Sequence, residues 1–132
     1  MANILEAAKV LTDFEPRHPF FVGIDSDGCA FDAMEIKHKE CFTPSTIKVW
    51  GLQSISKYAR ETAEFVNLYS TTRGLNRWVA LVRVFDLLAE RPEVLARHAK
   101  VPSGKVLKEF IASGYPLSDK GLAEYSMLYP DP

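Results

Sequence analysis

The sequence predicts an α/β fold in which one buried strand near the N-terminus is followed by a helical region, so that the chain as given is mainly helical. Three observations lead to this prediction. Residues 20–24 carry no charge and include four large apolar side chains. Two aspartates and a glycine follow directly, at positions 25, 27 and 28. From about residue 30 onward, apolar residues recur at three- and four-residue steps, which is the period of an amphipathic helix.

The apolar run at residues 20–24 predicts a strand buried on both faces, because a half-exposed strand alternates apolar and polar side chains. Ligands of open α/β sheets bind just beyond the carboxyl ends of the strands, which is where Asp25 and Asp27 follow. Two carboxylates so close together either bind a cation or raise the pKa of one of them. The alternative is an ordinary surface turn of the Asp-Ser-Asp-Gly type.

The pattern Asp-x-Asp-Gly-x-x-Phe-Asp at residues 25–32 resembles the first motif of the haloacid dehalogenase (HAD) superfamily of hydrolases. In that family the first Asp attacks phosphorus, and its carboxylate and the backbone carbonyl of the second Asp hold Mg²⁺. The second Asp side chain is the general acid and base. The resemblance therefore implies catalytic and metal-binding roles for Asp25 and Asp27, with Ser26 and Gly28 completing the active-site loop.

The resemblance covers residues 20–42 and implies two parts. Residues 1–32 would begin a HAD-like, Rossmann-type core with a helix, its first strand and the catalytic loop, and residues 33–132 would form a mostly helical cap region that is incomplete. The family also uses a Ser or Thr after a second strand, a Lys and a further acidic pair. Since no second buried strand is evident after Ile24, we expect the chain to be an N-terminal portion that is inactive or nearly so by itself.

The helical part is expected to be built around one central helix. Residues 75–90 are apolar nearly all round, which predicts burial on more than one side. Thr-Pro-Ser at residues 43–45 is expected to break the helical segment that begins near residue 30. Further helices are expected, in chain order, at residues 3–12, from Ser54 or Ser56 to about 69, at 92–98, from 102–103 to Gly114, and after a cap at Ser118.

Composition excludes several classes of partner. The chain has 132 residues and a net charge of −1, with Lys and Arg dispersed, so neither nucleic acid nor an anionic membrane is an expected partner. The longest apolar stretch, residues 78–89, contains Arg83 and Asp86 and is too short to span a bilayer. Cys29 and Cys41 are expected to be reduced thiols of a cytoplasmic protein.

The expected function is that of a Mg²⁺-dependent HAD-type hydrolase, a phosphatase that acts on a small phosphorylated metabolite through an aspartyl-phosphate. Arg73 and Arg77 are candidates for substrate contacts, the alternative being a solvated helix entrance. Lys37 and Lys39 are the lysines nearest the acidic loop. One HAD relative with a helical cap, phosphonoacetaldehyde hydrolase, forms an imine through a cap lysine, so the resemblance leaves phosphonatase chemistry open beside dehalogenase chemistry and assigns the imine role to neither lysine. The alternative function is a non-enzymatic helical interaction module in which the Asp-Ser-Asp-Gly turn is incidental.

Overall fold

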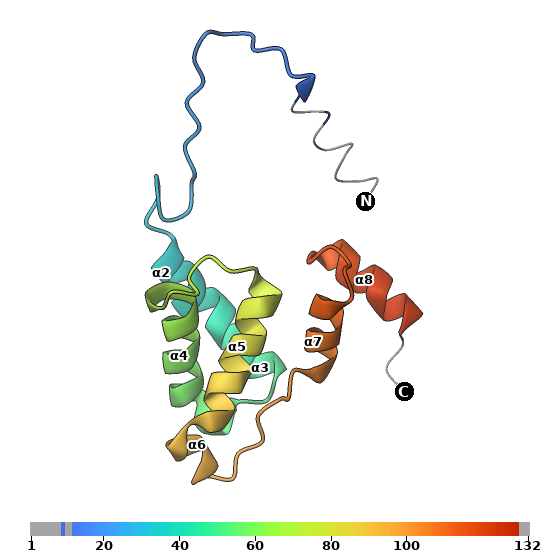
Figure 1. The fold of residues 1–132 in the computed structure, drawn as a ribbon. Helices are drawn as coiled ribbons and strands as arrows, with labels where there is room; N and C mark the ends of the chain where they lie inside the picture. Colours follow the sequence, from blue (N-terminus) through green and yellow to red (C-terminus); the bar gives the residue numbers. More distant parts are fainter. Residues whose placement is uncertain (1–8, 10–11, 130–132) are drawn as a thin grey trace. The chain divides into compact units, whose positions relative to one another are not determined.

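The computed structural model describes Lys9 and residues 12–129 (Figure 1). The chain divides into two compact units, Met1–Phe31 and Asp32–Pro132, and each is described by itself. The helix predicted at residues 3–12 lies, apart from Lys9 and Thr12, outside the described residues.

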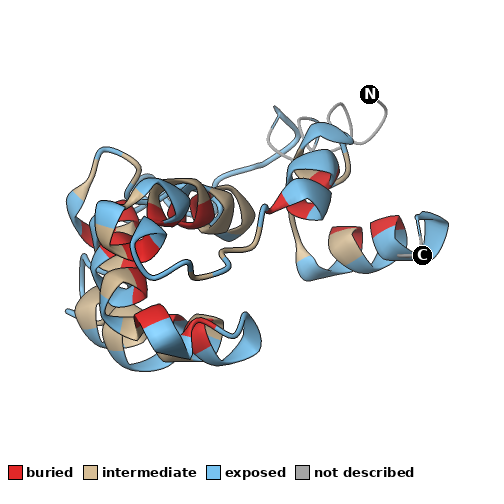
Figure 2. Cartoon of the chain, turned by 90° about the horizontal axis from the view of Figure 1, so that it is seen from below, coloured by how far each residue is buried: buried red, intermediate tan, exposed pale blue. Residues whose placement is uncertain are grey.

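The first unit contains an extended segment where the buried strand was expected. Phe20, Phe21, Val22 and Ile24 expose between 75% and 93% of their surface, and every described residue of this unit is exposed (Figure 2). The only β-type pairing among the described residues is an isolated parallel bridge between Asp27 and Phe31. The predicted α/β fold, with a Rossmann-type core that begins with this strand, is therefore wrong for the described part of the chain.

The physical reason is that a strand is not a local structure. Its backbone N–H and C=O groups must pair with a neighbouring strand, and its side chains must be covered on one or both faces. The described residues contain no second strand that could pair with residues 20–24. An apolar run by itself therefore stays extended, with its backbone and its side chains facing solvent.

The second unit begins with a helix that continues through the expected break. The α-helix α2 (Met34–Ile36), the π-helix η1 (Lys37–Phe42) and α3 (Thr43–Val49) follow one another without interruption, with Pro44 in the first turn of α3. The amide of Thr43 donates to the carbonyl of His38, five residues earlier. Proline lacks the donor that a regular helix needs, and it is tolerated at the first positions of a helical segment. The predicted break at residues 43–45 is thus wrong, because the change from π- to α-helix gives Pro44 such a position.

The other helices follow the sequence periodicity closely. Asn76 and Ser118 act as N-caps, with side-chain oxygens that accept from the amides of Trp78 at 3.0 Å and Gly121 at 3.1 Å. The expected helices after residue 53 are therefore confirmed. The elements are the 3₁₀-helix η2 (Gln53–Ile55), α4 (Ser56–Glu64), the π-helix η3 (Phe65–Tyr69), α5 (Arg77–Glu90), α6 (Pro92–Leu95), α7 (Lys105–Ala112) and α8 (Asp119–Leu128) (Figure 1).

Helix α5 is the centre of the second unit, as its apolar sequence predicts. It contacts α4, α6, α7 and η3, and α4 lies beside it in Figure 1. Phe85 and Leu88, exposed by 1% and 0%, pack in one core cluster with Ile55, and Val84 packs in a second with Val66. Burial from both sides of one helix is what holds the surrounding helices together.

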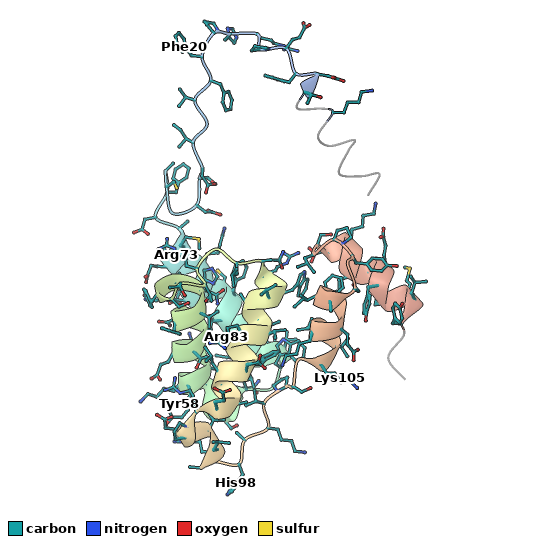
Figure 3. All side chains as sticks on the ribbon, viewed as in Figure 1. Phe20, Tyr58, Arg73, Arg83, His98 and Lys105 are labelled. Atoms are coloured by element: carbon teal, nitrogen blue, oxygen red, sulfur yellow. The ribbon has the colours of Figure 1, made fainter. Side chains whose placement is uncertain are left out.

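Aromatic contacts attach the last helices to this core. The Trp78 and Phe110 rings meet edge to face at a centroid distance of 6.3 Å, and Phe110 contacts Tyr125 of α8 at 5.4 Å. At the other end of the unit, the guanidinium groups of Arg91 and Arg97 lie 5.1 and 4.9 Å from the ring centroid of Tyr58, which Figure 3 labels on α4. These contacts fix both ends of α5 against its neighbours.

Candidate functional site

The acidic loop at residues 25–31 closes on itself through backbone hydrogen bonds. The amide of Ser26 donates to the Asp25 carboxylate at 2.8 Å, and the amide of Phe31 donates to the Ser26 carbonyl at 2.9 Å. The amide of Gly28 donates to the Phe31 carbonyl at 2.8 Å, and Gly28 has a φ of 75°, a conformation that glycine adopts without strain. The loop thus holds Asp25 and Asp27 close in the chain on an exposed turn.

These residues fit Mg²⁺ in donor type but supply only part of a site. Mg²⁺ takes hard oxygen ligands and commonly uses one or two carboxylates together with water and substrate oxygens. Asp25 and Asp27 offer such oxygens. No group of three or more His, Cys, Asp or Glu side chains that could hold a metal occurs in the described part of the chain.

The candidate substrate arginines lie at the entrance of α5. Arg73, labelled in Figure 3, is exposed in the loop that precedes α5, and its amide donates to the Ser70 carbonyl at 3.2 Å. Arg77 begins α5, pairs with Asp119 at 2.5 Å and lies 5.0 Å from the ring centroid of Trp78. Both arginines belong to the second unit, and only Arg77 lines a cavity there.

That cavity has a volume of about 430 Å³, opens to solvent and is lined by elements of the second unit. Its walls come from the helix that runs through α2, η1 and α3, from the end of α4 with η3, and from the start of α5. Polar groups include Lys37, His38, Asn67 and Arg77. Burial, and secondarily the charge of Lys37, lowers the pKa of His38, so the imidazole is neutral at neutral pH.

A polar cluster beside the cavity fixes the two π-helices to each other. Lys39 of η1 pairs with Glu35 and lies 3.9 Å from Glu64, and the Tyr69 hydroxyl of η3 donates to Glu35 at 2.7 Å. The hydrogen bond with Glu35 raises the pKa of Lys39. An imine-forming lysine needs a neutral amine, so Lys39 is unsuited to phosphonatase-type imine chemistry in this arrangement.

Sequence reasoning missed the cavity as a unit. His38 was not among the predicted site residues. Asn67 gave no signal at all. The available signal was that residues 42–47 and 74–82 contain no Asp or Glu. Whether these two segments line one cavity depends on how the helices cross, which local sequence does not show.

Comparison with protein-family models, with curated proteins and with solved structures finds no match to this chain. In the part of the chain that the structure describes, no helix combines the length and the apolar character needed to cross a membrane.

Proposed function

We propose that this chain carries the nucleophile and the acid/base group of a Mg²⁺-dependent hydrolase of the HAD type, which removes phosphate from a small phosphorylated metabolite. The observation that supports the proposal is the closed loop in which Asp25 and Asp27 stand two residues apart, exposed, beside Gly28 at positive φ. Such a turn presents two carboxylates to a ligand without burying either of them, and a carboxylate nucleophile needs access to its substrate.

The proposed reaction has two displacement steps. A carboxylate oxygen of Asp25 forms a bond to phosphorus while the bond from phosphorus to the leaving oxygen breaks, and Asp27 gives its proton to that oxygen. Asp27 then takes a proton from water, the water oxygen attacks phosphorus, and the bond to Asp25 breaks to release phosphate. Mg²⁺, which Asp25 and Asp27 would hold, supplies positive charge that offsets repulsion between the carboxylate and the phosphoryl group.

The test is turnover of p-nitrophenyl phosphate with Mg²⁺ by the complete encoded protein. Asp25→Asn is expected to abolish turnover, because an amide neither attacks phosphorus nor binds Mg²⁺ as well. Asp27→Asn is expected to reduce it by about 10²–10⁴-fold, the usual contribution of a general acid or base. Asp13→Asn, an exposed acid of the same unit outside the loop, is the matched control and should leave turnover unchanged. Activity that survives Asp25→Asn would refute the proposal.

A second candidate is a non-enzymatic interaction module, and one observation favours it. The large apolar side chains of residues 20–24 are exposed on an extended segment, which is typical of a surface that another protein covers. The same assay separates the two functions, since an interaction module has no turnover that depends on Asp25.

The cellular setting belongs to the same proposal. Cys29 and Cys41 are both free and exposed, as is usual for thiols in the reducing cytoplasm, where we place the protein. The net charge of −1 gives no attraction for nucleic acid or for an anionic membrane surface, so the proposed partner is the small phosphorylated substrate.

A further inference from the structure

We propose that the cavity between η1, η3 and the start of α5 binds a small amphiphilic anion, that is, an anionic head group on a compact apolar body. The volume of about 430 Å³ lies within the range of about 300–1,000 Å³ that is usual for small-molecule sites. The inference concerns the second unit alone and does not depend on the proposed hydrolase activity.

The charge of the lining selects an anion. Lys37 and Arg77 line the cavity, and none of its lining residues is Asp or Glu. The Asp119 partner of Arg77 is not a lining residue, and its side chain is 80% exposed. An ion pair in such contact with solvent contributes little stability, so an incoming anion can share or replace it at small cost. His38, neutral at neutral pH, adds a ring nitrogen that can donate to the same head group.

The rest of the lining suits an apolar body. Phe42, Leu75, Trp78 and Leu81 supply large apolar surfaces. Trp78 and Leu81 also pack against the main core cluster, which makes this wall rigid. The indole N–H of Trp78 is buried and has no acceptor among the described residues, so Trp78 contributes apolar ring surface to the site.

The two π-helices are an independent sign of a functional cavity. Regular α-helix is the more stable geometry, and π-helical turns are rare and occur frequently at functional sites. Here η1 supplies Lys37 and His38, and η3 supplies Asn67. The two segments are connected through Glu35, which pairs with Lys39 of η1 and accepts from the Tyr69 hydroxyl of η3. Two such departures from α-geometry around one cavity are most simply explained by selection for the shape of that cavity.

The test uses the 132-residue chain with Trp50→Phe, which leaves Trp78 as the single tryptophan and therefore as a fluorescence reporter in the cavity wall. The probes are phenyl phosphate and benzoate, with phenol and inorganic phosphate as the isolated halves of the ligand. The proposal predicts saturable binding of at least one aromatic anion, with a Kd at least about tenfold lower than for phenol or inorganic phosphate. Phenyl phosphate and benzoate together tell whether phosphate or carboxylate is the preferred head group.

Substitutions locate the binding. Lys37→Gln with Arg77→Gln should weaken the aromatic anion by about tenfold or more, the scale of a lost charge-assisted hydrogen bond. Arg73→Gln, which removes the same charge a few residues outside the lining, is the matched control, and Asp119→Asn controls for loss of the Arg77 ion pair. Arg73→Gln should leave the Kd unchanged, and Asp119→Asn, which removes a carboxylate that competes for Arg77, should leave it unchanged or lower it.

Two results would overturn the inference: no saturable binding of either aromatic anion at millimolar concentration, or binding that the double variant leaves unchanged. Circular dichroism reports whether the double variant folds. If it does not fold, amide chemical shifts of the wild-type chain during titration decide the matter. Shifts centred on Lys37, Asn67 and Arg77 support the site, and shifts centred elsewhere contradict it.

Discussion

At Gly121 of α8, the packing leaves no room for a side chain. Gly121 is buried, and a methyl group on its Cα would overlap the backbone carbonyl oxygen of Pro116. Gly121→Ala should therefore destabilise the protein by about 1–3 kcal/mol, the usual cost of overpacking. This outweighs the gain of about 1 kcal/mol that Ala normally brings to a helix.

Urea unfolding followed by circular dichroism measures this change. Lys120→Ala, at a neighbouring side chain that is 89% exposed, is the control and should stay within about 0.5 kcal/mol of wild type. A Gly121→Ala protein as stable as the wild type would mean that α8 does not approach Pro116 so closely.

At the scale of elements, Phe85 carries the central prediction. It is 1% exposed on α5, joins the main core cluster and meets Trp50 edge to face at a centroid distance of 5.0 Å. Phe85→Ala should cost about 3–5 kcal/mol, the range for deletion of a buried aromatic side chain. Arg83→Ala, an exposed position on the same helix, should change stability by no more than about 0.5 kcal/mol. A loss below about 1 kcal/mol for Phe85→Ala would show that α5 is not the core helix.

The helices could be predicted from sequence because their signals are local. An N-cap such as Ser118 and an apolar stripe such as that of α5 lie within a few residues of the hydrogen bonds they specify. The conformation of residues 20–24 could not be predicted in this way, because an apolar run forms a buried strand only when another part of the chain supplies a partner strand. The helix break predicted at residues 43–45 was wrong for a related reason. It was predicted from the local presence of Pro44, whereas the π-helix η1 directly before it places Pro44 in the first turn of α3, where its missing N–H is tolerated.

The candidate sites also differ in whether their residues are neighbours in the sequence or are brought together by the fold. Asp25, Asp27 and Gly28 are adjacent in sequence, so their shared loop could be anticipated, and their roles stay predictions. Arg77 was selected for its position at a helix start, without any view of what lies opposite it. The cavity brings it into the same lining as Lys37, forty residues earlier, and only the crossing of two helices produces that proximity.

At the scale of the whole molecule, the second unit holds all the buried side chains of the described residues, from Thr43 to Tyr125. The described residues of the first unit are all exposed. A chain that begins at Asp32 keeps every one of these buried side chains and should keep the helical circular dichroism signal. Its free energy of unfolding should stay within about 0.5 kcal/mol of that of the 132-residue chain, as for other changes at exposed positions. A larger loss would show that the core depends on the first unit.

Limited digestion with chymotrypsin tests the same division in the intact chain. Phe20 and Phe21 are 87% and 93% exposed on an extended segment, whereas Phe85 and Phe110 are exposed by 1% and 0% within helices. Cleavage at a buried site requires opening of the fold. A stability of about 5 kcal/mol leaves only about one molecule in 10³–10⁴ open, so the buried sites should be cut slower by about that factor. Mass spectrometry of early time points should thus find cuts at Phe20 and Phe21 while the helical fragment stays whole. Equal protection of Phe20 and Phe85 would mean that residues 20–24 are covered in solution, and the extended, exposed segment would then be the wrong description of the first unit.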